Sequence, residues 1–229
     1  MKEQKISIIM PVLNEEKNLH NTLSSLSLSD NEELIVVDGG STDNTMEIAR
    51  EFTGGVYQTK TGRASVMNFG AGKADGDILL FLHADCLLPE NAFALVRDTM
   101  SDTGIAAGAF SLSIDHPGWY LRLTEFMANT RAKLTSLIYG DQAMFLKKNI
   151  FKMLGGFADI PLMEDIEISL RLKKHGRIIF LREPVKASPR RWLLEGPLYT
   201  TLRDWSIAFL YTFLKVSPDK LIRHYRDVR

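Results

Sequence analysis

The feature that most constrains the fold is a series of continuous apolar runs, each ended by a polar turn. The clearest run is Ile6–Val12, which stops just before Asn14. Unbroken hydrophobicity is typical of a strand that is buried on both faces, as in a parallel sheet. Residues 34–37 and 78–82 form two further runs of this kind. The first half of the chain therefore predicts a buried, mainly parallel sheet.

Segments with apolar residues at helical spacing lie between these runs, and this alternation predicts an α/β fold with helices flanking the central sheet. Ligands of such sheets bind at the carboxyl ends of the strands, where this chain places polar clusters at 14–15, 38–40 and 83–85. We predict helices over 15–28, from about 44 past 49, over Arg63–Lys73 and from 89 to about 100, with a short strand at 56–57.

The second half is less regular. We expect strands over 106–114, 141–146 and 178–181, helices over 119–137 and 164–175, and helical structure from Trp192 to the end. Residues 1–188 are predicted to form one catalytic domain, with a nucleotide-binding half of about 1–100 and an acceptor half of about 101–188. Residues 189–229 are predicted to be a helical C-terminal extension of that domain.

The charge balance and the single cysteine narrow the surroundings of the protein. Lys and Arg together equal Asp and Glu, at 28 each, so no net field draws the chain to nucleic acid. Cys86 is the only cysteine, and we find neither a signal peptide nor a long apolar span, so we expect a cytoplasmic protein. Residues 198–216 are apolar and flanked by basic residues, which indicates either peripheral contact with the inner face of the membrane or a helix packed on the domain.

Several short polar motifs follow one another along the chain. They are Pro-Val-Leu-Asn-Glu-Glu at 11–16, Val-Val-Asp-Gly-Gly-Ser-Thr-Asp-Asn-Thr at 36–45, Gly-Arg at 62–63, Gly-Asp at 76–77, Leu-His-Ala-Asp at 82–85, Gly-Gly-Phe at 155–157 and Met-Glu-Asp-Ile-Glu at 163–167. In this order the motifs resemble those of the family 2 glycosyltransferases, and the resemblance spans roughly residues 6–180. The His-Ala-Asp form at 83–85 with Arg-Arg-Trp at 190–192 is also similar to small bacterial transferases described as radical-SAM/selenodomain-associated. The resemblance implies a GT-A nucleotide-diphospho-sugar transferase fold.

The resemblance implies a donor site and a divalent cation, Mn²⁺ or Mg²⁺, held by Asp85. His83 stands where the family usually has the first Asp of its DxD motif, and it is a candidate second ligand. Gly39 replaces a second Asp that reads the base in many relatives, so the donor base stays open. A cation would neutralise the charge that develops on the diphosphate leaving group. The donor-binding candidates are Pro11, Asn14, Glu15, Asp38, Arg63, Ala84 and Asp85.

For the transfer step the resemblance implies Asp165 as the base that takes the proton of the acceptor hydroxyl in an inverting displacement. Each acid also has a structural interpretation, because Asp38 can cap a helix and Glu164 and Asp165 can favour a helix N-terminus. The candidates for contact with the acceptor or the diphosphate are Gly156, Phe157, Glu164, Arg191 and Trp192.

The implied partners are a nucleotide-sugar donor and a sugar, lipid or small-molecule acceptor. A nucleotidyltransferase is a competing interpretation, although residues 11–16 lack the glycine-rich basic loop that usually follows its first strand. An NAD oxidoreductase is disfavoured because no Gly-x-Gly-x-x-Gly opens the first helix. A nucleotide-sugar-binding module without turnover is the alternative outside the enzymes, and the departures at His83 and Gly39 are its support.

Overall fold

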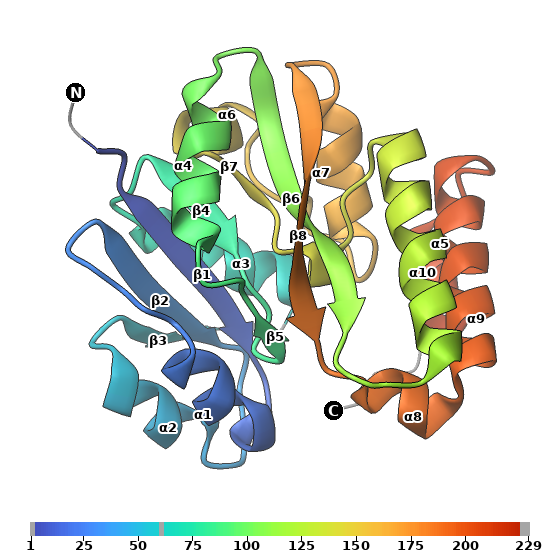
Figure 1. Cartoon of the computed structure of the whole chain (residues 1–229), viewed down its shortest axis with the longest axis horizontal. Coiled ribbons are helices and arrows are strands. Elements are labelled where there is room, and N and C mark those ends of the chain that lie inside the picture. Colours follow the sequence, from blue (N-terminus) through green and yellow to red (C-terminus); the bar gives the residue numbers. More distant parts are fainter. Residues whose placement is uncertain (1–2, 60–61, 225–229) are drawn as a thin grey trace.

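The first four strands lie side by side and parallel in the computed structural model, which describes residues 3–59 and 62–224 (Figure 1). Their order is β3-β2-β1-β4, with every neighbouring pair parallel. The crossovers that parallel pairing requires are helical. The strands are β1 (Ile6–Val12), β2 (Glu32–Asp38), β3 (Val56–Gln58) and β4 (Ile78–Phe81).

The helices of this half follow their predicted places, and α3 (Arg63–Lys73) matches its predicted bounds. Gly70 lets α3 approach the sheet, because a Cβ there would lie 2.6 Å from the side chain of Ile9. The other helices are α1 (Glu16–Ser24), α2 (Thr45–Phe52) and α4 (Ala92–Ser101), and a short strand that the sequence did not indicate, β5 (Cys86–Leu87), follows β4.

The sheet becomes mixed in the second half, which corrects the prediction of a mainly parallel sheet. Its eight strands have the order β3-β2-β1-β4-β7-β6-β8-β5; β7 is antiparallel to both of its neighbours and β5 is antiparallel to β8. The pattern of apolar residues indicates which strands are buried but not their direction, so the sequence did not indicate that β7 is antiparallel. The strands are β6 (Ile105–Ile114), β7 (Phe145–Lys147) and β8 (Arg177–Ala187).

The predicted strand over 141–146 is wrong in its first part, because Gly140–Gln142 forms the 3-10 helix η1. Strand β8 is also longer than predicted and reaches Ala187, where it pairs with Cys86. That pairing places the segment after β8 beside the end of β4. The remaining helices of this half are α5 (Trp119–Thr135), α6 (Lys148–Met153) and α7 (Glu164–Leu172).

Apolar side chains from alternate positions of the strands fill both faces of the sheet. One buried cluster includes Ile8 and Leu80 with Leu19 of α1 and Val96 of α4. The other includes Ile9 and Leu79 with residues of α3 and α7. A strand that buries both faces has to be apolar at every position, which is the physical reason for the unbroken runs in the sequence.

The C-terminal helices pack together and against α5 at one side of the molecule (Figure 1). The helical structure begins at Arg190, two residues before the predicted start, and is interrupted at Gly196, which has a φ of +89°. No helix in the described part of the chain is long and apolar enough to cross a bilayer. The predicted helical end at 225–229 lies outside the described residues. The elements are α8 (Arg190–Glu195), α9 (Pro197–Thr212), α10 (Pro218–Leu221) and η2 (Ile222–His224).

Candidate active site

A cavity of about 620 Å³ lies where the carboxyl ends of β1, β2 and β4 meet α5, α7, α8 and α9. The position is the one that ligands take in open α/β sheets. Ten of the sequence candidates line it, and they come from both halves of the chain. These are Pro11, Glu15, Arg63, His83, Ala84, Asp85, Glu164, Asp165, Arg191 and Trp192.

Asn14 and Asp38 do not line the cavity; they hold its rim together. The buried carboxylate of Asp38 accepts hydrogen bonds from the backbone N–H groups of Gly40 and Ser41 and from the Gln58 amide, at 3.0–3.1 Å. Asn14 has a left-handed φ of 54°, and its side-chain oxygen accepts from the N–H of Thr42 at 2.9 Å. Both side chains therefore fix the loops that follow β1 and β2.

Gly156 and Phe157 also lie away from the cavity lining. Phe157 is buried against Phe81 and Phe151 in the core. The side-chain amide of Asn68 exchanges two hydrogen bonds with the backbone of Phe157, at 2.8 and 2.9 Å. Gly156 has a φ of +75°, which favours glycine. The structure thus places this motif in a turn that ties α3 to α6.

Three metal-ligating side chains cluster at the end of β4. Ligand atoms of His83, Asp85 and Cys86 lie within 4.8 Å of one another. Burial, with the Asp85 charge beside it, raises the pKa of the Cys86 thiol well above 9.0, so the sulfur stays protonated and is a poor ligand. The carboxylate and the imidazole remain, and both ligate Mn²⁺ while a carboxylate suits Mg²⁺. The residues present therefore fit a divalent cation at Asp85 and His83.

Arg190 reaches this cluster from the first turn of α8. Its Nη2 lies 3.0 Å from Glu15 Oε1 and 3.9 Å from Asp85 Oδ2. The sequence analysis selected Arg191 from the same Arg-Arg-Trp segment, whereas the Nη2 of Arg191 lies 3.0 Å from Asp204 Oδ2. Both arginines line the cavity. The motif was the available signal, but only the pairing of β5 with β8 shows which arginine faces Asp85.

Asp165 is the second residue of α7 and lines the same cavity. Its Oδ2 accepts from the N–H of Gly140 at 2.7 Å, and its Oδ1 accepts from the N–H of Ile166 at 2.7 Å. Burial, together with the neighbouring charge of Glu164, raises the pKa of Asp165 from 3.8 to about 6. A positioned carboxyl group with a pKa near the working pH is suited to accept a proton.

Glu164 is turned toward Arg63, which also lines the cavity. The side chain is buried, and its Oε1 lies 3.7 Å from the Nε of Arg63, which begins α3. Adjacent residues of a helix point in directions about 100° apart, so Glu164 and Asp165 face different parts of the cavity. This arrangement separates the ion pair with Arg63 from the carboxyl group of Asp165.

Gly140 lies between the side chains of Asp165 and His83. A Cβ on Gly140 would lie 2.9 Å from Cε1 of His83 and 3.6 Å from Oδ2 of Asp165. The first distance is shorter than an ordinary contact, so a larger residue here would displace the His83 ring. No sequence pattern indicated this close approach, because Gly140 lay outside every predicted helix and strand.

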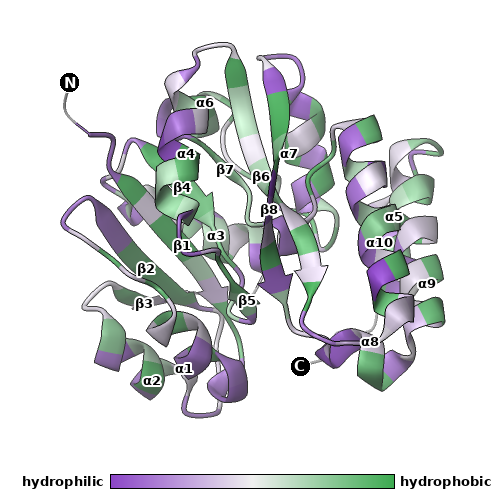
Figure 2. Ribbon diagram, in the orientation of Figure 1, coloured by the Kyte–Doolittle hydropathy of each residue, from purple (hydrophilic) through white to green (hydrophobic). Residues whose placement is uncertain are grey.

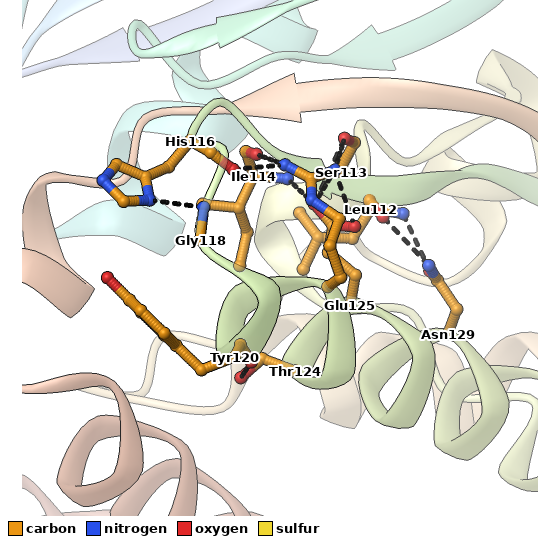
Figure 3. Close-up of polar contacts among 10 residues, drawn as sticks. Leu112, Ser113, Ile114, His116, Gly118, Tyr120, Thr124, Glu125 and Asn129 are labelled. Atoms are coloured by element: carbon orange, nitrogen blue, oxygen red, sulfur yellow. Dashed lines mark hydrogen bonds and ion pairs between the residues drawn. The ribbon is translucent and has the colours of Figure 1, made fainter.

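The far end of the cavity is built by residues that sequence reasoning missed: Arg131 of α5, Tyr139 before η1, and Trp205 of α9. They come from separate segments, with Trp205 lying 74 positions after Arg131, and carry no motif. Helix α5 is anchored to the end of β6, where β7 no longer pairs with it (Figure 3). There the Asn129 amide bonds both backbone groups of Leu112 at 2.7 and 2.9 Å.

Comparisons with known proteins show which family the chain matches. Residues 7–158 match the family described as glycosyl transferase family 2. Glycosyltransferase AglE of Haloferax volcanii is 26% identical over 172 residues, which cover 70% of this chain and 54% of AglE. The chain thus spans about half the length of this relative.

Two solved structures share the fold. The mannosyltransferase PcManGT of Pyrobaculum calidifontis, in complex with GDP-Man and Mn²⁺, superposes with a TM-score of 0.69 at 19% identity, over 100% of this chain and 67% of that one. S. aureus TarS 1-349, in complex with UDP-GlcNAc, gives a TM-score of 0.63 at 18% identity, over 96% and 70% of the two chains.

Proposed function

Since the chain belongs to glycosyl transferase family 2 and is a glycosyltransferase with the GT-A fold, we propose that it transfers a sugar with inversion from a nucleotide-diphosphate donor. The observation that carries the proposal is the single cavity in which Asp165, with a pKa of about 6, faces the cluster of His83 and Asp85. One base and one site for an anionic leaving group are what a single displacement needs.

In the proposed reaction, the Asp165 carboxylate takes the proton of an acceptor hydroxyl while that oxygen attacks the anomeric carbon. The bond from the anomeric carbon to the diphosphate breaks on the opposite side, and the electron pair leaves with the diphosphate. The hydrogen bonds from Gly140 and Ile166 hold the carboxylate in place during this transfer. No acid is required, because the diphosphate is a stable anion.

Residues on the donor side of the cavity would stabilise the negative charge of the diphosphate and take no part in proton transfer. A divalent cation bound by Asp85 and His83 would act as a Lewis acid on the diphosphate oxygens. Arg190, which contacts Glu15 and Asp85, and Arg63, which contacts Glu164, are placed to meet the same negative charge. The two structures that share the fold are complexes with GDP-Man and Mn²⁺ and with UDP-GlcNAc, which supports a nucleotide-sugar donor of either base.

We further propose that the protein works in the cytoplasm and contacts a membrane surface through α5, α8 and α9. Figure 2 shows apolar segments along α5 and α9 at one side of the molecule. Leu134, Trp119 and Leu198 are 82%, 76% and 73% exposed. The other exposed apolar side chains of this surface are Leu123, Phe126, Leu193, Leu194, Tyr199, Leu202, Phe209, Phe213 and Leu214.

A bilayer suits this surface because its exposed side chains are apolar and basic residues lie beside them. An exposed apolar area of this extent marks an interaction site, and Trp, Tyr and Phe with Leu are the side chains that interfacial helices insert. The exposed basic residues Lys133, Lys215 and Lys220 lie on or next to the same helices and would attract anionic headgroups. The cavity is lined by α9, so an acceptor could reach it from such a surface.

A donor screen tests the proposed function. Thermal unfolding is measured with UDP-, GDP- and dTDP-sugars in the presence of Mn²⁺, and release of the nucleotide diphosphate is followed for each donor that stabilises the protein. We expect one donor class to raise Tm only with the metal, and slow hydrolysis of that donor. Binding without any turnover, under all acceptor conditions, would instead identify a binding module.

A further inference from the structure

Arg131 lies in the far end of the cavity with its guanidinium stacked on two aromatic rings. Its central carbon is 4.0 Å from the centroid of the Tyr139 ring and 4.9 Å from the centroid of the Trp205 ring. Aromatic rings stabilise the faces of a guanidinium, and its N–H donors all project from the edge. The stack therefore fixes the plane of the cation and leaves its edge for hydrogen bonding.

The edge of this guanidinium has buried donors without partners. Nε and Nη1 are shielded from solvent, and neither has a hydrogen-bond partner within the described ranges 3–59 and 62–224. Across the same ranges, no carboxylate oxygen lies within 4 Å of the Arg131 nitrogens. Burial disfavours the charged form of the guanidinium and lowers its pKa. A buried cation in this condition is costly unless an anion compensates it.

The neighbouring carboxylates favour the charge of Arg131 only from a distance. Asp204 contacts Arg191 and Arg203, each at 3.0 Å. The oxygens of Asp165 accept backbone hydrogen bonds. Burial raises the pKa of Asp141, so this carboxyl group holds its proton more readily than usual. None of these acids therefore contacts the guanidinium of Arg131 in the described part of the chain.

The site is rigid and adjoins the catalytic base. Tyr139, which stacks on Arg131, precedes Gly140, whose N–H donates to Asp165. Helix α5, which carries Arg131, is held to β6 by Asn129 and by Arg122, whose Nη2 donates to the carbonyls of Ile114 and His116 at 2.6 Å (Figure 3). A group bound at Arg131 is thus positioned with respect to Asp165 by packed elements.

We propose that Arg131 binds a phosphate group on the acceptor and thereby orients the acceptor hydroxyl toward Asp165. The inference rests on the proposed transfer function and assigns a substrate class to the same cavity. Phosphate matches the site because its oxygens accept from Nη2, the one guanidinium nitrogen of Arg131 that is not shielded, and its charge compensates the partly buried cation. The phosphate could belong to a lipid headgroup or to a soluble phosphate ester, and both present the same oxygens.

The test compares the wild-type chain with Arg131→Gln, Arg131→Lys and Lys174→Gln. Lys174 is the control, since it is an exposed cation that does not line the cavity and lies outside α5, α8 and α9. Binding of glycerol 3-phosphate and of uncharged glycerol is measured by ligand-observed NMR. We expect the wild type to bind only the phosphate, Arg131→Gln to weaken it by about tenfold or more, and Lys174→Gln to change it by less than about twofold.

Vesicles distinguish the two sources of phosphate. A lipid phosphate is indicated if the protein floats with vesicles of phosphatidic acid in phosphatidylcholine, but not with phosphatidylcholine alone, and if this flotation requires Arg131. A soluble ester is indicated if only the binding of glycerol 3-phosphate requires Arg131. Arg131→Lys retains the charge and should keep part of the affinity, which guards against a Gln variant that unfolds. Equal binding by the wild type and a folded Arg131→Gln in both arms would overturn the inference.

Donor turnover by the wild-type chain keeps the two hypotheses apart. If a nucleotide sugar is hydrolysed but phosphate binding does not depend on Arg131, the inference about the acceptor is wrong and the transfer function stands. If no donor is bound or hydrolysed under any condition, the proposed function is wrong, and the acceptor assignment that rests on it is wrong as well.

Discussion

Replacement of Asp165 by Asn separates a catalytic base from a helix-end charge. The change keeps the volume of the side chain but removes its basicity, and we expect kcat to fall on the order of 10²–10⁴-fold. Asn can accept only one of the two hydrogen bonds from Gly140 and Ile166, at a cost of about 1 kcal/mol, so the variant should remain folded. Donor affinity should barely change, because the proposed donor contacts are made by Arg63, Asp85 and Arg190 and not by Asp165.

The same role of Asp165 predicts how strongly the activity of the wild type depends on pH. With the pKa of Asp165 at about 6, roughly a tenth of the carboxyl is ionised at pH 5 and about nine tenths at pH 7. The base acts when ionised, so kcat/KM of the wild type should rise about tenfold between these values. A carboxyl with the ordinary pKa of 3.8 would already be about 94% ionised at pH 5, and the rise would be under about 10%.

The assay follows release of the nucleotide diphosphate from pH 4.5 to 8.5, with donor binding measured in parallel. Asp159→Asn is the control, because Asp159 is an exposed acid outside the cavity lining. The residual activity of Asp165→Asn should lose the acidic limb. Near-wild-type turnover in that variant, or an acidic limb that persists in it, would refute Asp165 as the base.

Three further changes test the rest of the site and its surroundings. Asp85→Ala should abolish Mn²⁺-dependent nucleotide binding measured by calorimetry, and an unchanged metal-dependent affinity would contradict a cation site there. Gly140→Ala should lower kcat by about tenfold, since the added Cβ would lie 2.9 Å from the His83 ring. Gly72→Ala is the control, because a Cβ there meets nothing within 4 Å. This control should leave kcat unchanged and stabilise helix α3 by up to about 1 kcal/mol. The double variant Leu198→Asp, Leu202→Asp should abolish flotation with anionic vesicles, while Met153→Asp on α6 should not. A folded wild type that never floats would show that α5 and α9 do not bind membranes.

The sequence alone determined the parallel half of the fold. Strand Ile6–Val12 and helix Arg63–Lys73 were predicted with the bounds that the structure has, because a strand buried on both faces must be apolar throughout and a helix on the sheet must repeat its apolar positions. The order of the motifs also identified the family, and Asp85 and Asp165 lie in one cavity as the resemblance implied. These features are local, so they leave a local pattern.

Only the tertiary structure decided the features that depend on contacts between distant segments. The direction of β7, the choice of Arg190 rather than Arg191 at Asp85, and the use of Asp38 to hold a loop all follow from which backbone groups meet in space. The stack of Arg131 on Tyr139 and Trp205 joins three segments that share no motif. A side chain's partners are set by packing across the whole chain, and neither hydrophobic periodicity nor motif spacing encodes them.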